Sequence, residues 1–181
     1  MRGTIVGWRE WAALPDIGIE RLRAKLDTGA HTCSLHAIDI EPIESSLGFF
    51  IRFRLDEGGP RRLQRLHCWR SVRDAGGHSS LRPVIRTELL LADRSIKIDL
   101  CLTDRSRMRH RLIIGRRVLR QRFTIDCSVD NLHQPNTTSG LLSRSGQTLT
   151  NTTSNPSIHR LSPVDYNLRQ RAKVGASGIR R

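Results

Sequence analysis

A short segment near the start of the chain contains residues that could carry out acid–base chemistry. Asp27 ends a run in which apolar and polar residues alternate, and it is followed at once by Thr28, Gly29 and Ala30. A carboxylate at this place could act as a general acid or base, and a glycine two positions later lets the backbone turn. The same residue types are common in ordinary turns. The tetrapeptide alone therefore leaves open a strand that simply ends in a turn.

A second element, far along the chain, adds to this picture. Residues 112–116 read Leu-Ile-Ile-Gly-Arg and lead into a short segment of helical character. Together with the segment at Asp27 they resemble the retropepsins, dimeric viral-type aspartic peptidases. In those enzymes the catalytic loop reads Asp-Ser/Thr-Gly-Ala/Ser, and a later strand crosses beneath it. The resemblance implies that Asp27, Thr28 and Gly29 form the catalytic motif.

A longer set of motifs resembles one bacterial family, the RimB-like retropepsins. Besides the segment around Asp27, the matching motifs lie at residues 6–11, 34–37, 81–87 and 108–116. The resemblance covers roughly residues 5–126. It implies trimming of glutamate residues that a partner ligase has added to the C-terminus of a ribosomal protein.

The family has long been labelled as ATP-dependent zinc proteases, and the sequence does not support that label. It contains no His-Glu-x-x-His motif, and its seven histidines are scattered singly. It also lacks the Gly-x-x-x-x-Gly-Lys-Ser/Thr loop that would cradle the phosphates of ATP. We therefore expect neither a metal ion nor another cofactor.

Aspartic peptidase chemistry needs two carboxylates that share one proton. Like charges a few ångströms apart cannot both ionise, so one carboxylate acts as a base on water while the protonated one polarises the scissile carbonyl. The chain has one candidate motif, so a second Asp27 must come from a two-fold-related copy. The sequence therefore predicts a homodimer.

Two positions depart from the resembling families. Viral retropepsins have an acid where this chain has His31, and that acid pairs with the arginine that corresponds to Arg116. Arg116 is therefore expected to be available to the substrate or to another acid. The RimB-like pattern has serine where Cys33 stands. Neither departure touches Asp27.

Basic residues surround a glycine-rich turn at residues 74–80, where a retropepsin flap would cover the cleft. Guanidinium groups bind carboxylates in a forked geometry, so several of them would suit a run of glutamates. The expected substrate-binding residues are Ala30, Arg70, Arg73, His78, Arg82, Arg86 and Arg116. A solvated basic hairpin tip without a ligand is the alternative. For Arg105, Arg107, Arg109 and Arg111, which would share one face of a strand, solvation or nucleic-acid contact is an equal alternative.

Many short runs with strand character must position these residues. They lie at residues 4–8, 22–27, 49–55, 83–91, 95–102, 111–115 and 123–127. Residues 61–69 read as the returning half of a hairpin after 49–55, and residues 116–121 as one or two helical turns. This pattern predicts an all-β, retropepsin-like fold, a closed β-barrel with one short helix.

Composition divides the chain into two parts. Residues 4–133 hold most of the apolar side chains and are expected to form the peptidase domain. Residues 134–181, rich in Ser, Thr, Asn, Arg and Gly, are expected to be a disordered basic tail. The chain shows no signal-peptide segment and no apolar run approaching the about 18 residues of a membrane span. We therefore expect a soluble, cytoplasmic protein without a membrane partner.

The net charge leaves a second function open. Lysine and arginine number 31 against 17 aspartates and glutamates, a balance of +14 that favours an acidic partner. One such partner is a glutamate-rich peptide or ribosomal protein tail. The alternative is a non-enzymatic basic β-barrel that binds RNA or the ribosome. The sequence lacks interleaved aromatic residues for base stacking, which disfavours that alternative, although the tail could contact nucleic acid in a peptidase as well.

Overall fold

The computed structural model describes residues 3–73, 76–134, 159–160 and 162. Most of the predicted basic tail, residues 134–181, lies outside the described residues, as do residues 74 and 75 of the glycine-rich turn. Within the described part, the regular structure is β-strand apart from one four-residue α-helix and one three-residue 3-10 turn. The predicted all-β fold with one short helix is confirmed. Across these described ranges, no helix has the length and apolarity needed to cross a membrane.

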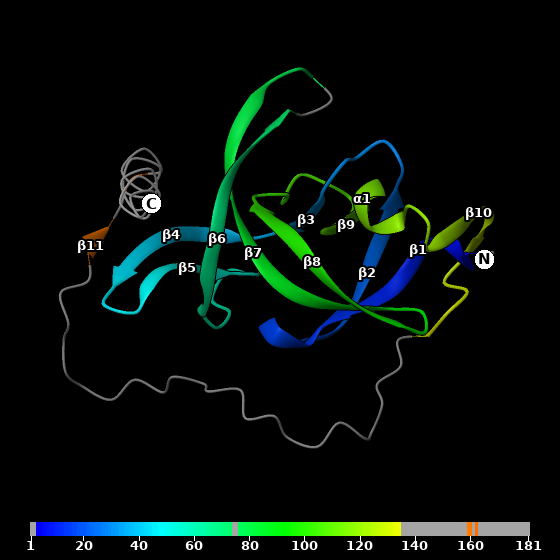
Figure 1. Ribbon diagram of the computed structural model, residues 1–181, viewed down its shortest axis with the longest axis horizontal. Helices are drawn as coiled ribbons and strands as arrows, with labels where there is room; N and C mark the ends of the chain where they lie inside the picture. Colours follow the sequence, from blue (N-terminus) through cyan, green and yellow to red (C-terminus); the bar gives the residue numbers. More distant parts are fainter. Residues whose placement is uncertain (1–2, 74–75, 135–158, 161, 163–181) are drawn as a thin grey trace, which may run out of the picture.

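Six strands close into a barrel (Figure 1). Around the barrel they follow the order β1 (Thr4–Leu14), β2 (Ile19–Asp27), β9 (Leu112–Gly115), β3 (Cys33–His36), β8 (Arg94–Thr103) and β7 (Ser79–Leu91). The barrel closes where β7 pairs with β1, through Ala12 opposite Leu91. β9 runs parallel to β2 and antiparallel to β3. A late strand is thereby inserted between the two strands that flank the loop after Asp27.

A second group of strands extends the sheet beyond the barrel. From β7 it continues through β6 (Arg62–Arg73), β5 (Gly48–Arg54), β4 (Ile38–Ser45) and β11 (His159–Arg160). β6 and β7 also form a long hairpin that projects from the barrel, on the same side as the loop between β2 and β3 (Figure 1). This hairpin stands where the sequence predicted a flap.

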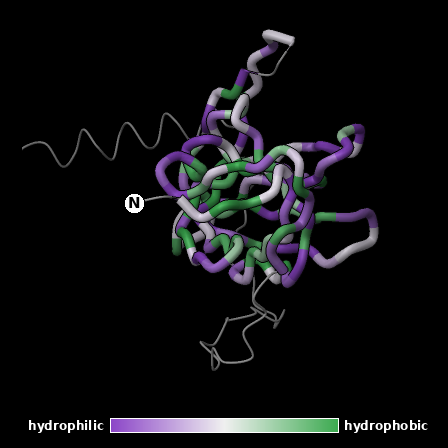
Figure 2. Tube along the Cα trace, turned by 90° about the vertical axis from the view of Figure 1, so that its right-hand side faces the viewer, coloured by the Kyte–Doolittle hydropathy of each residue, from purple (hydrophilic) through white to green (hydrophobic). Residues whose placement is uncertain are grey.

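The barrel interior is filled by aliphatic side chains from all six strands. Residues at most 1% exposed include Val6, Ala24, Leu35, Ile85, Leu100, Leu102, Leu112 and Ile114. Burying one such Leu or Ile side chain contributes about 1.5–3 kcal/mol. Figure 2 shows hydrophobic stretches in the body of the fold and mostly hydrophilic projecting loops. This packing gives the loop after Asp27 a rigid base.

A buried carboxylate fixes the end of the barrel domain. After α1 (Arg116–Leu119), β10 (Phe123–Asp130) pairs parallel to β1. Glu10 on β1 is fully buried, and its carboxylate accepts backbone N–H bonds from Gly7 at 2.6 Å, Leu132 at 3.1 Å and His133 at 3.0 Å. A buried carboxylate is costly unless bonds of this kind satisfy it. We call this arrangement the Glu10 clamp.

Candidate active site

Asp27 is the last residue of β2 and lies opposite Gly115 in the parallel pairing with β9. Its Oδ1 accepts backbone N–H bonds from Gly29 at 3.0 Å and from Ala30 at 3.3 Å. Its Oδ2 accepts a bond from the Lys25 ammonium at 3.0 Å. The Asp27 side chain is 24% exposed. The loop therefore holds an oriented carboxylate that solvent can still reach.

The surroundings of Asp27 favour its ionised form. Burial by itself would raise the pKa of this carboxyl group. The hydrogen bond and charge of Lys25, together with the N–H bonds of Gly29 and Ala30, outweigh burial and lower the pKa below its ordinary value. The single chain thus holds Asp27 as a carboxylate at neutral pH, the form that a general base requires.

Gly115 leaves no room for a side chain beside this loop. A Cβ atom there would lie 2.6 Å from the backbone carbon and oxygen of Thr32, which is closer than real Cβ atoms come. α1 begins at the next residue, and the backbone N–H of Arg116 donates to the carbonyl of Ala30 at 2.9 Å. The loop is therefore held between β9 and the first turn of α1.

The Arg116 side chain also binds the loop. Its Nη1 donates to the carbonyl oxygens of Thr28 at 3.1 Å and Gly29 at 3.3 Å. In viral retropepsins an acid at the position of His31 pairs with this arginine. In this chain the carbonyl oxygens of the loop are its hydrogen-bond partners instead. Arg116 was expected to contact substrate, and the structure places its guanidinium beneath the candidate catalytic motif.

Two of the predicted substrate-binding arginines meet at a carboxylate outside that motif. Nη2 of Arg70 lies 2.9 Å from Oδ2 of Asp99, and Nε of Arg86 lies 3.3 Å from Oδ1. Burial alone would raise the pKa of Asp99, but hydrogen bonds from these two arginines lower it. The Asp99 bond in turn raises the pKa of Arg70.

The remaining predicted substrate-binding residues are spread over the loop and the hairpin. Ala30 is half-buried beside the Asp27 carboxylate. Arg82 is half-buried on β7, and its Nε donates to the Ser80 hydroxyl at 2.9 Å. Arg73 and His78 are exposed near the tip of the hairpin. The structure thus brings Ala30 and Arg116 to the catalytic motif and distributes the others along the flap.

Sequence reasoning missed two basic groups near Asp27. Lys25 could have been found, because alternate residues of a strand share a face. Arg105 could not, because residues 104–111 form a loop instead of the strand considered for them. The half-buried Arg105 guanidinium donates to the His110 carbonyl at 3.0 Å. Burial and the charge of Arg82 lower the pKa of Arg105, and the charge of Asp27 acts in the opposite direction.

Two larger surface cavities lie beside the barrel and do not include Asp27. Their volumes are about 470 and 390 Å³, and they share the lining residues His36, Leu55, Asp56 and Arg111. In the ranges that the structure describes, no three His, Cys, Asp or Glu side chains gather closely enough to hold a metal ion. Asp27 lines neither of these two cavities, and its side chain is 24% exposed in the single chain.

Comparison with known proteins identifies relatives that share this barrel. The chain is 36% identical to a probable alpha-L-glutamate ligase of Parasynechococcus marenigrum and 34% identical to one of Desulfotalea psychrophila, each over 131 residues. These alignments cover 69% and 67% of this chain and 28% of each relative. The chain thus spans little more than a quarter of the length of these curated relatives.

A solved structure and a family description also match the chain. The crystal structure of a Legionella pneumophila protein of unknown function has a TM-score of 0.60 and 29% identity, covering 72% of this chain and 98% of that chain. Residues 5–136 match the family described as retropepsin-like aspartic endopeptidase RimB. That range contains both Asp27 and Gly115. The chain belongs to the RimB-like family of retropepsin-like aspartic endopeptidases.

Proposed function

We propose that the chain is a homodimeric aspartic peptidase in which Asp27 of each subunit supplies one of two catalytic carboxylates. The observation that carries this proposal is the Asp27 carboxylate, oriented by Gly29 and Ala30 and set on a loop that Gly115 and Arg116 hold. The family match is consistent with this chemistry. Because a subunit contributes one such carboxylate, a two-fold-related copy must provide the second.

In the proposed reaction, the ionised Asp27 takes a proton from water as the water oxygen bonds to the scissile carbonyl carbon. The protonated Asp27 of the second copy donates a hydrogen bond to the carbonyl oxygen. Collapse of the tetrahedral intermediate then breaks the C–N bond, and a proton passes to the leaving amine. Lys25 favours ionisation of one carboxylate, and like-charge repulsion keeps the other protonated.

The partial exposure of Asp27 in the single chain supports the dimer. The two larger cavities do not include this residue, whereas a peptidase must enclose its substrate around the catalytic carboxylates. A second copy placed over Asp27, with the β6–β7 hairpins as flaps, would supply the missing walls. Arg73 and His78 at the hairpin tips would then face the bound chain.

We further propose a glutamate-rich peptide as the substrate. The chain carries a charge of +14, and arginines line the hairpin and the neighbouring strands. The curated relatives are named probable alpha-L-glutamate ligases, and this chain matches about a quarter of their length. A peptidase of this kind would trim glutamates from the C-terminal extension of a ribosomal protein or a similar acidic peptide. A ribosomal substrate would place the reaction in the cytoplasm.

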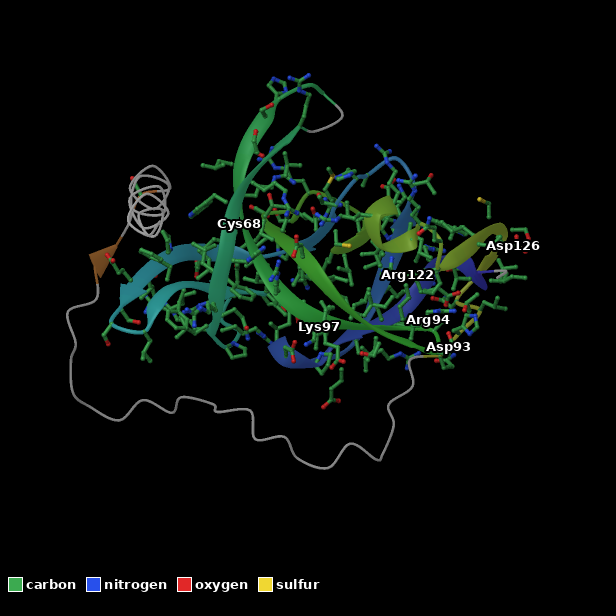
Figure 3. The ribbon with its side chains drawn as sticks, viewed as in Figure 1. Cys68, Asp93, Arg94, Lys97, Arg122 and Asp126 are labelled. Atoms are coloured by element: carbon green, nitrogen blue, oxygen red, sulfur yellow. The ribbon has the colours of Figure 1, made fainter. Side chains whose placement is uncertain are left out.

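Mass spectrometry of a peptide with a C-terminal oligoglutamate tail tests this function. Wild-type protein is expected to shorten the tail, and Asp27→Asn is expected to leave it intact. Asp93→Asn is the matched control, because Asp93 is exposed in the turn between β7 and β8 and undergoes the same chemical change (Figure 3). Equal trimming by wild type and Asp27→Asn would show that Asp27 is not catalytic.

The same variants distinguish the peptidase from the second function that the net charge favours, a basic β-barrel that binds RNA. An RNA-binding module would bind RNA with an affinity that falls steeply with salt. That affinity would be indifferent to Asp27→Asn, and the oligoglutamate peptide would remain uncut by every variant.

A further inference from the structure

Four basic side chains gather around Asp99 on the outer face of β8. Besides Arg70 at 2.9 Å and Arg86 at 3.3 Å, Nη1 of Arg117 lies 3.6 Å and Nε2 of His67 lies 4.0 Å from its carboxylate oxygens. We call Asp99, Arg70, Arg86 and Arg117 the Asp99 cluster. Its three arginines carry three positive charges against one negative charge.

The fold assembles this cluster from separate elements. Arg86 on β7 lies directly opposite Asp99 on β8. Arg70 comes from β6, at the base of the projecting hairpin, and Arg117 comes from α1. The two strands of one hairpin and the distant helix α1 therefore deliver guanidinium groups to one point.

A small cavity opens beside the cluster. Its volume is about 150 Å³, which compares with about 30 Å³ for one water in the liquid and so admits a carboxylate with some solvent. Of the cluster, Arg70, Asp99 and Arg117 line the cavity, and the exposed Arg86 contacts Asp99 from outside it. The lining also includes Thr32, Lys97 and Arg122. Lys97 comes from β8 and Arg122 follows α1 (Figure 3). The two add positive charge, so the walls are strongly cationic.

One polar atom of the cluster has no partner. Nη1 of Arg70 is buried and forms no hydrogen bond with the described residues. A buried donor without a partner costs about 1–3 kcal/mol. A single carboxylate thus does not balance the charge of the three arginines, and an anionic group in the cavity would add the missing negative charge.

The cavity adjoins the loop that carries Asp27. Thr32, one of its lining residues, belongs to the segment between Asp27 and β3, and its hydroxyl lies 3.9 Å from Sγ of Cys101 on β8. An extended peptide advances about 3.3 Å per residue. Thr32 follows Asp27 by five residues, so their backbones are at most about 18 Å apart, a span that an extended peptide covers in about six residues.

We propose that the Asp99 cluster is a carboxylate-binding subsite that holds one glutamate side chain of the acidic substrate, away from the scissile bond. This proposal rests on the proposed function for the identity of the ligand. Asp99 keeps the arginines together, and the substrate carboxylate adds the second negative charge. The exposed arginines, Arg86 and Arg117, are 69% and 61% exposed and so can reorient toward a ligand.

Equilibrium binding to the full chain carrying Asp27→Asn tests the subsite without cleavage. The probe is a fluorescently labelled peptide that ends in five glutamates, and the measurement is fluorescence anisotropy. Adding Arg86→Gln and Arg117→Gln is expected to raise the Kd about fivefold, because two exposed charge contacts are lost. The control pair, Arg61→Gln and Arg120→Gln, removes the same charge at exposed positions outside the cluster and is expected to change the Kd less than about twofold.

A second set of peptides locates the contact. Each glutamate of the probe is replaced in turn by glutamine. At one position, the peptide with glutamine is expected to bind the Arg86→Gln and Arg117→Gln double variant and its parent protein with the same Kd. Asp99→Asn is expected to tighten binding, because its carboxylate no longer competes for the arginines. If the double variant does not fold, Lys97→Gln replaces it, with an expected Kd increase of about twofold.

The possible failures are distinguishable. An equal change in Kd for the cluster pair and the control pair, or an unchanged Kd in Lys97→Gln, overturns the subsite. Absence of any binding by the Asp27→Asn protein overturns it as well. Selective binding by a protein whose wild-type form cuts no peptide overturns the peptidase and leaves the subsite standing.

Discussion

Asp27 lies directly opposite Gly115 in the pairing of β2 with β9, and Gly115 packs against the backbone of Thr32 with no space for a Cβ atom. The two residues belong to motifs that are far apart in the sequence. Their pairing explains why the Leu-Ile-Ile-Gly-Arg segment accompanies the Asp-Thr-Gly-Ala segment: the glycine lets β9 pass beneath the loop, and the arginine then binds the loop from below.

Gly115→Ala is expected to destabilise the fold by about 3 kcal/mol, because the new Cβ meets backbone atoms that cannot move aside cheaply. Urea unfolding measures this loss. Gly29→Ala is the informative contrast, since its Cβ would lie 3.2 Å from Oδ1 of Asp27. That variant is expected to remain folded and to lose activity. A stable Gly115→Ala protein would contradict the packing described for β9.

Lys25→Gln is expected to move the acidic limb of the kcat/KM profile to higher pH. Lys25 lowers the pKa of Asp27, whereas burial acts in the opposite direction. Without the ammonium group the pKa rises, and the base form is lost at a higher pH as the solution is acidified. The limb reports the carboxylate pair as a whole. Arg61→Gln removes the same charge at a position away from Asp27 and is expected to leave the acidic limb in place. An acidic limb that moves to lower pH in Lys25→Gln would refute the conclusion that Lys25 lowers the pKa of Asp27.

Arg116→Lys is expected to lower kcat by about tenfold or more with little change in KM. Lysine keeps the charge but lacks the planar guanidinium that reaches the carbonyls of both Thr28 and Gly29. Arg116 acts through the loop as a positioning residue, so the split between kcat and KM is the decisive readout. Arg120→Lys, at an exposed position just after α1, serves as the control. A variant with normal kcat and a raised KM would instead indicate direct substrate binding.

Mixing subunits tests whether catalysis needs two copies of Asp27. When a fixed amount of wild-type protein exchanges subunits with an equal amount of Asp27→Asn, half of the wild-type subunits enter mixed dimers. If mixed dimers are inactive, total activity is expected to fall to about half. Asp93→Asn added in the same proportion should not lower it. Unchanged activity after demonstrated subunit exchange would rule out a shared active site.

Much of the barrel could be predicted because its strands alternate clearly. The segment at 22–27 shows that alternation and lies within β2, and the predicted segment at 83–91 forms most of β7. Besides the two-residue β11, two strands were missed. β3 is only four residues long, and its polar residues Ser34 and His36 are buried, so it does not show the polar, exposed face of a surface strand. β4 contains Pro42 and a register shift between Ile38 and Glu41, and both features obscure a strand pattern.

The candidate catalytic loop was predictable for a different reason. Asp27, Gly29 and Gly115 satisfy backbone requirements that allow few substitutes, so they leave a motif. The arginine contacts leave none, because they depend on strand register. Arg86 reaches Asp99 since β7 and β8 pair in a particular alignment, and a shift of one residue would turn its side chain to the other face.

The Glu10 clamp bears on how this barrel can be joined to other polypeptides. By holding residues 132 and 133 against β1, it gives any following segment a fixed anchor at the boundary of the fold. A displacement of an attached segment would have to break the hydrogen bonds of Glu10 to residues 132 and 133 before it moved β10. The relatives carry the matching region as 28% of a longer protein. A single buried carboxylate thus fastens residues 132 and 133 to β1, so a segment attached after them would be anchored at some distance along the chain from Asp27.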